Sequence, residues 1–597
     1  MIKLSTIELR INDKVVEVSA GLTILQACET AGVQVPRFCY HNDLSIAGNC
    51  RMCLVAIAGS SKLVASCMMP VSANMHVLTD SSKVRQAQQG VMEHLLINHP
   101  LDCPICDQGG ECDLQDQAQF FGATHGRFSG YKRAVEDKNV GPLIKTVMTR
   151  CIHCTRCIRF ATEIAGISSL GTMGRGRGTE VGSYVERLFQ SELSGNVIDL
   201  CPVGALTAKP QAFYSRSWEA EKVVISDVFD AVGINLAITV RGNDILRILP
   251  IKTNIKGNWI SDKARFAYDG FAFQRLTHNL VRVQNNFLLC SWLGQAYFTD
   301  VKNTISSAFF VGSFLGAQET QKIFSTFIKT GGSFFGVNNA FSSWNVDQRS
   351  NFLYNASMLD IDAYDCVVLM NFNPKTEAAV FFGRLRQRVT AGKLDVFEVG
   401  QFSYDSTFFS LGTSTDTFLA LLEGRHSFCK KLLRYNNVLV LKGTELNSRS
   451  DFFSWSSLLE CFSSTFFSKS QYSHYYLQNR ATLRLNTFHN AANEAYRLDL
   501  ALVSPIFGDS LVTATSVYLF EYDNVSLFSL FDRKATSIFY EGSHFDIGAR
   551  FADGVFASVS VFERSGIFMN TQGLAFVNNK LITEKAIFSN RMLSIVA

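Results

Sequence analysis

The chain has 597 residues, of which 47% are hydrophobic and 18% are charged, and its formal net charge is +4. This length exceeds what one hydrophobic core can organise and predicts roughly three or four domains. The composition excludes a small disulfide-stapled module and a disordered chain, and the near-neutral charge excludes the strongly basic surface of a nucleic-acid binder.

The N-terminal residues predict a β-hairpin followed by a short helix. Apolar residues alternate over residues 7–11, Asn12 and Asp13 supply a turn, and the alternation resumes over residues 16–18. Thr23 suits the start of the helix and Gly32 its end. A hairpin, a helix and then a cysteine-bearing loop resemble the plant-type ferredoxin arrangement.

The loop after this helix carries the first of three cysteine groups, with the spacing C-x10-C-x2-C-x13-C: Cys39, Cys50, Cys53 and Cys67. The N-terminus does not read as a secretory signal, and repeated Cys-x-x-Cys pairs favour metal binding over disulfides. Four thiolates suit a 2Fe-2S cluster, although plant-type ferredoxins have a tighter C-x4-C-x2-C spacing. A structural zinc site is the alternative, but zinc usually uses two short knuckles and this set has one.

The second group lies within HPLDCPICDQGGECDLQD and consists of Cys103, Cys106 and Cys112. An apolar-periodic helix from about Ser82 leads to His99, and Pro100 forces the chain out of it. Three thiolates leave one iron of a 4Fe-4S cubane without a ligand, which makes His99 a candidate. The spacing fits equally well a histidine that only caps the helix C-terminus. Asp102 and Asp107 are weaker candidates, because hard carboxylates suit soft sulfide clusters poorly.

The third group opens like a bacterial 4Fe-4S ferredoxin run, C-x2-C-x2-C, with Cys151, Cys154 and Cys157. The usual fourth cysteine three residues later is absent, but a Cys-Pro pair occurs at Cys201. In two-cluster ferredoxins the cysteine of Cys-Pro ligates the other cluster, so Cys201 is expected to complete one 4Fe-4S site.

Basic residues surround the third group, among them Arg150, Arg156 and Arg159. They form either an ordinary solvated face or a positive environment that offsets the negative charge of a thiolate-ligated cluster and raises its reduction potential. The glycines of residues 174–178 do not make a dinucleotide fingerprint, because no strand precedes them and the third comes too early.

Together these motifs resemble one family closely, the large iron–sulfur subunit of the peripheral arm of respiratory complex I, the proton-pumping NADH:ubiquinone oxidoreductase. The resemblance covers nearly all of the chain and implies an electron relay, with the NADH, flavin and quinone sites on other subunits and no catalytic residue here. It also implies that His99 is a ligand. The implied ligands are Cys39, Cys50, Cys53 and Cys67 for one 2Fe-2S cluster, His99, Cys103, Cys106 and Cys112 for one 4Fe-4S cluster, and Cys151, Cys154, Cys157 and Cys201 for another.

The C-terminal two thirds resemble the family's degenerate relative of molybdopterin oxidoreductases. The motifs that carry this likeness lie at residues 258–263, 349–351, 373–374, 492–495 and 563–573. Independently, the short apolar run at residues 365–372 predicts a buried parallel strand.

Two departures from the family's pattern predict which cofactors are missing. The sequence has no cysteine between Cys201 and Cys290, so no fourth cluster is expected. Leu574 stands where relatives often have arginine, so no molybdopterin is expected, and no motif calls for flavin or NAD. The cysteines outside the three groups are expected to be buried small hydrophobic residues: Cys28, Cys290, Cys366, Cys429 and Cys461.

The predicted fold is a multidomain α/β and α+β chain. It comprises a ferredoxin-like (β-grasp) 2Fe-2S domain at 1–80, a His/Cys 4Fe-4S cluster domain at 81–135, a 4Fe-4S ferredoxin-like domain at 136–218 and a degenerate molybdopterin-oxidoreductase-like α/β region at 219–597. Other interpretations are an iron–sulfur subunit of a formate dehydrogenase or hydrogenase, which the lack of further cysteines disfavours, and a redox-inactive zinc scaffold.

The resemblance also predicts partners and a location. The partners are the flavin- and NADH-binding subunit and other peripheral-arm subunits, and membrane association goes through the complex, because no apolar run reaches the roughly 18 residues of a spanning helix. The hairpin begins by Ile7, which leaves no room for a transit peptide. With 49 phenylalanines the composition suits a T-rich gene and predicts mitochondrial encoding, on the matrix side of the inner membrane. The cytoplasmic face of a bacterial plasma membrane is the alternative.

Overall fold

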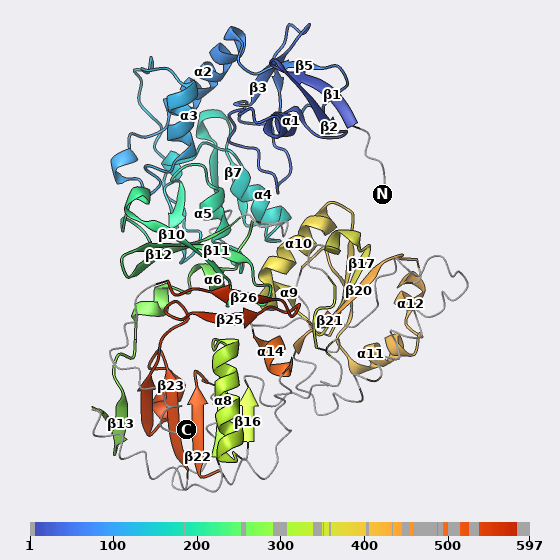
Figure 1. Ribbon diagram of the computed structural model, residues 1–597. Helices are drawn as coiled ribbons and strands as arrows, with labels where there is room; N and C mark the ends of the chain where they lie inside the picture. Colours follow the sequence, from blue (N-terminus) through green and yellow to red (C-terminus); the bar gives the residue numbers. More distant parts are fainter. Residues whose placement is uncertain are drawn as a thin grey trace. The chain divides into compact units, whose positions relative to one another are not determined.

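The computed structural model divides the chain into two compact units, Met1–Glu221 and Lys222–Ala597 (Figure 1). The division into four regions stays a prediction. Four of the residues named above lie outside the described residues: Ser350, Asn351, Cys461 and Ala492. The structure describes residues 6–183, 187–251, 258–290, 307–332, 334–337, 349, 352–356, 360–400, 405–432, 434–444, 454, 457, 486–487, 493–499, 514–523 and 536–581.

The first unit opens with a mixed sheet whose strands follow the order β2-β1-β5-β3-β4. Strands β1 and β2 form the predicted hairpin, in which Ile7 lies opposite Val18, and β1 pairs in parallel with β5. Helix α1 (Ile24–Thr30) packs Leu25 and Ala27 into the core of this sheet, which completes the predicted β-grasp arrangement. The strands are β1 (Thr6–Ile11), β2 (Lys14–Ser19), β3 (Leu54–Ile57), β4 (Val64–Ala65) and β5 (His76–Leu78).

Both ends of α1 follow the sequence signals. The Thr23 hydroxyl accepts a hydrogen bond from the backbone N–H of Gln26, and the Gln26 side chain accepts one from the backbone N–H of Thr23 at 2.9 Å. This reciprocal capping box satisfies two N–H groups that would otherwise lack partners. Gly32 follows the helix with a left-handed φ of +72°, which glycine adopts without strain.

The other helices of the first unit carry or flank the remaining cysteine groups. Helix α2 begins after the N-cap Ser81, whose hydroxyl accepts from the N–H of Val84, and it ends two residues before His99, as predicted. Two short antiparallel strand pairs lie in the region of the third group. They are β6 (Ile144–Thr146) with β9 (Leu206–Ala208), and β7 (Leu170–Met173) with β8 (Glu180–Ser183). The helices are α2 (Ser82–Ile97), α3 (Asp113–Phe121), α4 (Arg156–Glu163) and α5 (Asn196–Leu200).

The second unit is an α/β structure, and its described strands form several sheets. Strands β10 (Glu221–Ser226), β11 (Asn235–Arg241) and β12 (Asp244–Pro250) are neighbours in this order, and β11 pairs with β12 antiparallel. A larger sheet has the order β14-β13-β24-β23-β22-β15-β16, with β13 (Leu280–Val283), β14 (Asn286–Leu289), β15 (Ser307–Val311), β16 (Phe334–Val337), β22 (Ser516–Phe520), β23 (Ser537–Gly542) and β24 (Gly554–Ala557). Another has the order β19-β18-β17-β20-β21, with β17 (Cys366–Met370), β18 (Asp395–Val399), β19 (Phe409–Gly412), β20 (Val438–Lys442) and β21 (Asn486–Thr487).

The second unit also contains a β-hairpin and several helices. The hairpin pairs β25 (Gly566–Met569) with β26 (Ala575–Asn578). The helices are α6 (Asp262–Arg265), α8 (Ala317–Thr330), α9 (Pro374–Glu377), α10 (Ala379–Thr390), α11 (Thr415–Leu422), α12 (Ser427–Leu432), α14 (Glu494–Asp499) and α16 (Ile547–Phe551). Among the described helices, none combines the length and apolar character that a membrane crossing requires.

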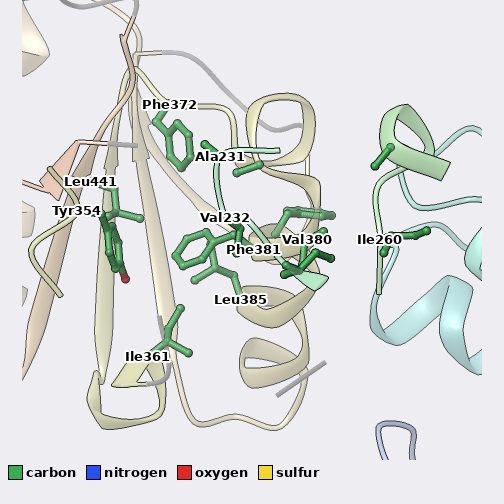
Figure 2. Packing of buried hydrophobic residues seen from close by; sticks show 14 of the residues in the cluster. Ala231, Val232, Ile260, Tyr354, Ile361, Phe372, Val380, Phe381, Leu385 and Leu441 are labelled. Atoms are coloured by element: carbon green, nitrogen blue, oxygen red, sulfur yellow. The ribbon is translucent and has the colours of Figure 1, made fainter. Parts of the chain in front are cut away.

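Strand β17 is the buried parallel strand predicted from residues 365–372. It pairs in parallel with β18 and β20, and every one of its residues is buried. A parallel strand covered on both faces reads as a continuous apolar run, which is why the sequence revealed it. Figure 2 shows how Val232, Phe372, Phe381, Leu385 and Leu441 pack around α10 and the neighbouring sheet in one hydrophobic core.

The cysteines outside the three groups follow the expectation with one exception. Cys28, Cys366 and Cys429 are buried, and burial raises the pKa of the Cys28 thiol to about 11. Cys290 is only half-buried, so the expectation that it is a buried residue is wrong, and it packs against the edge of a hydrophobic core. It directly follows β14, an edge strand whose residues are mostly exposed, and such a position buries little side-chain surface.

Truncation of Leu385 to alanine tests the core around α10. Leu385 is fully buried, so Leu385→Ala is expected to cost about 2–5 kcal/mol through lost contacts and the remaining cavity. Leu419→Ala on α11 is the matched control, because Leu419 is 38% exposed and its loss is expected to stay below about 1 kcal/mol. Hydrogen exchange of the α10 amides measures the difference, and equal losses in the two variants would contradict it.

Candidate functional site

Cys39, Cys50 and Cys53 of the first cysteine group lie on the loop between α1 and β3, and Cys67 follows β4. Cys39 and Cys53 are 1% exposed and Cys67 is fully buried. The Cys39 thiol lies within hydrogen-bonding distance of Cys50 and Cys67, and Cys67 also contacts Cys53. These contacts hold the pKa of the Cys39 and Cys53 thiols below the ordinary value. Four sulfur donors therefore converge, and soft thiolates are the donors that iron–sulfur clusters and zinc prefer.

Gly48 allows this loop to fold tightly. Its φ is +63°, and a Cβ at this position would lie 2.1 Å from the Sδ atom of Met68, next to the ligand candidate Cys67. Glycine is the residue that accepts both the left-handed backbone and the close approach. Arg51 continues the turn with a φ of +58°.

The second group lies around α3. Cys103 starts a short 3-10 turn and is exposed, whereas Cys106 and Cys112 are 9% and 6% exposed. Cys112 immediately precedes α3, and its Sγ lies 3.7 Å from the carbonyl oxygen of Pro202, beside the third group. Electrostatic interaction between Cys106 and Cys112 places these two thiols near one another.

His99 has the state that a metal-binding imidazole needs. Its Nδ1 atom is buried and has no hydrogen-bond partner, while the ring makes a hydrogen bond to the backbone of Arg150. Burial, with the charges of Lys132 and Arg150, lowers the pKa of His99 to about 4. The imidazole is therefore neutral at physiological pH, and it carries a buried lone pair that a metal could take.

Asp102 and Asp107, the weaker candidates for the fourth ligand of the second group, have other partners. Arg150 is 5% exposed and donates to Asp102 at 3.0 Å. Asp107 lies 3.6 Å from the ammonium group of Lys145 and accepts from the backbone N–H of Phe213. Both aspartates thus serve ion pairs in the first unit.

The third group brings together the N-terminus of α4 and the C-terminus of α5, which contact one another (Figure 1). Cys157 is the second residue of α4, and Cys201 follows the last residue of α5. Burial raises the pKa of the Cys151, Cys154, Cys157 and Cys201 thiols, and Cys157 and Cys201 each interact electrostatically with Cys151 and Cys154. The remote Cys201 therefore lies beside the C-x2-C-x2-C run.

Residues between these cysteines adopt unusual backbone conformations. His153 and Thr155 have φ values of 55° and 60°, in the left-handed region that residues with a Cβ rarely enter. The His153 N–H donates to the Sγ of Cys151 at 3.4 Å. Such local strain clusters at binding sites, where the surrounding structure holds it in place.

All three groups contribute to one hydrophobic core of the first unit. Cys39, Cys112 and Cys154 are buried members of this core, and Cys50, Cys151 and Cys201 pack against it. The apolar members that surround them are Phe38, Met52, Met92, Leu114, Val203 and Ala205. At least one thiol of each group therefore lies in a shared apolar environment.

Several contacts that assemble the site join residues too distant in sequence for any local pattern to indicate. The Ser45 N–H donates to the Glu163 carboxylate at 2.9 Å, and the Asn49 side chain donates to the His153 carbonyl at 2.9 Å. The sequence also gives no sign that Gly204 lies close to Cys106, although a Cβ at Gly204 would lie 2.2 Å from the Sγ of Cys106.

The described residues contain no preformed group of three or more His, Cys, Asp and Glu side chains that could hold a metal ion. Three observations indicate the candidate ligands: the cysteine spacing, the convergence of thiols and the unpartnered Nδ1 atom of His99.

Family models match successive parts of the chain. The matches are a 2Fe-2S iron-sulfur cluster binding domain at residues 5–82, the NADH-ubiquinone oxidoreductase-G iron-sulfur binding region at 88–127, the ferredoxin-like domain of NADH-quinone oxidoreductase subunit 3 at 141–207, the NADH-ubiquinone oxidoreductase NDSU1/NuoG-like 4Fe-4S domain at 220–269 and molybdopterin oxidoreductase at 275–590. The predicted fold classes are thereby confirmed. The stretch 220–269 matches a 4Fe-4S domain but contains no cysteine.

Curated relatives match almost the whole chain. The 75 kDa subunit of NADH-ubiquinone oxidoreductase from Reclinomonas americana is 41% identical over 585 residues, which cover 94% of this chain and 83% of that protein. The mitochondrial NADH dehydrogenase (ubiquinone) iron-sulfur protein 1 of Solanum tuberosum is 42% identical, covering 95% and 76%. A subunit of the NADH-quinone oxidoreductase of Rickettsia felis is 40% identical, covering 96% and 84%.

Gly204→Ala tests the geometry of the second group. The added methyl group must displace the Cys106 sulfur, so we expect this variant to lose the metal of that group, about four iron atoms per chain if a 4Fe-4S cluster binds there. Gly126→Ala is the control, because a Cβ at Gly126 meets nothing within 4 Å. Iron and sulfide analysis of the purified complex measures the loss, and full iron content in Gly204→Ala would refute the prediction.

Proposed function

The chain belongs to the family of 75 kDa iron–sulfur subunits of NADH–ubiquinone oxidoreductase, and from this membership we propose that it relays electrons within that complex, from the flavin reduced by NADH on a partner subunit toward ubiquinone. The observation that carries the proposal is the packing of three cysteine groups around one hydrophobic core. Bound iron–sulfur clusters would supply one-electron redox chemistry. The chain's own residues set distance, potential and insulation, and they need no acid, base or nucleophile.

The proposed ligand sets follow the three groups. Each set is rich in soft thiolate donors, and all of these cysteines except Cys103 are buried or half-buried, which suits iron–sulfur clusters. The 2Fe-2S cluster takes Cys39, Cys50, Cys53 and Cys67, one 4Fe-4S cluster takes His99, Cys103, Cys106 and Cys112, and the other takes Cys151, Cys154, Cys157 and Cys201.

The burial of these groups supports a relay. The core residues around them exclude water, which lowers the local dielectric constant and prevents side reactions of reduced centres. Cys103 is exposed, so the second group lies nearest to solvent in the first unit and needs a covering surface in the assembled complex.

The second unit is proposed to hold no redox cofactor. Residues 202–289 contain no cysteine, so no further cluster is assigned, and no molybdopterin is assigned to this unit. No flavin or NAD is assigned to this chain.

The assembly and its location are inferred from the relatives. We place the chain in complex I, beside the flavin- and NADH-binding subunit and the other peripheral-arm subunits, on the matrix side of the mitochondrial inner membrane. A bacterial relative matches equally well, so the cytoplasmic face of a bacterial membrane is the alternative setting. An iron–sulfur subunit of a formate dehydrogenase or hydrogenase is disfavoured, because the matching relatives over nearly the whole chain are complex I subunits.

Metal analysis of the native complex tests the relay. We expect about ten iron atoms bound to this chain with matching acid-labile sulfide, and low-temperature EPR signals from one 2Fe-2S and two 4Fe-4S clusters. A subunit that holds zinc and no inorganic sulfide would overturn the proposal, and molybdenum or tungsten would revive the formate dehydrogenase interpretation.

His99→Cys tests the unusual ligand. A thiolate replaces a neutral imidazole, so the cluster is expected to persist while the added negative charge lowers its reduction midpoint. An EPR-monitored redox titration measures the midpoint, and His125→Cys at an exposed histidine is the control that leaves it unchanged. An unmoved midpoint in His99→Cys would argue against His99 as a ligand.

A further inference from the structure

Arg156, the first residue of α4, contacts a segment beside each of the three cysteine groups. Its side chain is buried, with the residue 8% exposed. It donates to the carbonyl oxygen of Tyr40 at 2.8 Å and to that of Leu200 at 3.4 Å, and it lies 4.0 Å from the carboxylate of Asp113. Tyr40 follows Cys39, Leu200 precedes Cys201, and Asp113 follows Cys112.

Arg159, one turn later on α4, provides a natural comparison. It donates to the carbonyls of Cys39 and Ser45 on the first loop and to the carbonyl of Cys154 at 3.4 Å. These contacts fall on the first and third groups. The two arginines therefore differ in the groups that they contact, since Arg156 also contacts the segment that carries Cys112.

The charge of Arg156 has little compensation from acidic side chains. Its acidic neighbour, Asp113, is 4.0 Å away and half exposed, and the other two partners are neutral carbonyls. A buried guanidinium is costly unless negative charge lies nearby. Each of these three contacts lies one residue from a cysteine, namely Cys201, Cys39 or Cys112, so the sulfur groups are the sites whose negative charge this guanidinium can balance.

We propose that Arg156 is a positioning residue shared by all three ligand loops, which fixes their mutual spacing and raises the reduction midpoints of all three clusters. Arg159 does the same for the first and third clusters. The proposal rests on the proposed electron-relay function and adds a common electrostatic element to it, because one buried cation stabilises the reduced, more negative state of each neighbouring site.

The test uses EPR-monitored redox titrations of the complete complex, with iron and sulfide measured on the same samples. In Arg156→Gln we expect all three midpoints to fall, each by about tenfold in the one-electron reduction equilibrium, or ~59 mV. In Arg159→Gln we expect the first and third midpoints to fall and the midpoint of the His99 cluster to stay. Arg156→Lys keeps the charge and is expected to restore most of the shift. Arg175→Gln, at an exposed position of the same unit, is the control without effect.

The outcomes separate this inference from the proposed function. If the native complex lacks the three clusters, the proposed function fails. If the native complex has them and Arg156→Gln retains full iron with fewer than three midpoints lowered, the inference alone is overturned. If Arg156→Gln loses iron, the other two variants decide: full iron with midpoints close to native in Arg156→Lys, together with two lowered midpoints in Arg159→Gln, supports the inference, and any other pattern overturns it.

Discussion

Negative charge buried in a protein must be balanced, and this constraint shapes the first unit. Thiols of three groups gather in one hydrophobic core, where a thiolate has little access to water. The balancing charges come from Arg150, Arg156 and Arg159, of which the first two are 5% and 8% exposed. Arg150 also pairs with Asp102, whereas Arg156 and Arg159 donate mainly to backbone carbonyls, which leaves positive charge for the sulfur atoms. Arg156 and Arg159 each contact loops that are remote from one another in sequence.

Helix ends add a second form of compensation. Cys112 precedes α3, and Cys157 lies in the first turn of α4, so both sit at helix N-termini where N–H groups point outward. Burial raises the pKa of the Cys112 thiol, and the backbone N–H groups of Leu114 and Gln115 oppose that shift. The N-terminal end of a helix dipole favours a thiolate in the same way. The fold thus places two of the proposed ligands where the backbone itself is positively polarised.

The sequence predicted those features that depend on short-range pattern. The hairpin at residues 7–18, the capped helix after Thr23, the helix before His99 and strand β17 are confirmed, because apolar period, caps and proline act over a few residues. Contacts between distant segments were not predictable. Arg156 and Tyr40 are 116 residues apart, and nothing near Gly204 signals its closeness to Cys106. The half-buried Cys290 was misjudged for the same reason, since edge position is a property of the sheet.

Residues 220–269 match the model of a 4Fe-4S domain but lack the cysteines that could ligate a cluster. The stretch contains no cysteine, yet Ala231, Val232 and Ile260 are buried in the core that also includes α10 (Figure 2). Metal binding contributes to folding free energy, so a segment without ligands needs another source of stability. Ile238 and Ala264 are fully buried in the same core, and apolar burial of this kind is worth about 25 cal/mol per Å². Apolar packing therefore stabilises the described part of this segment, in accord with the proposal that the redox centres belong to the cysteine groups of the first unit.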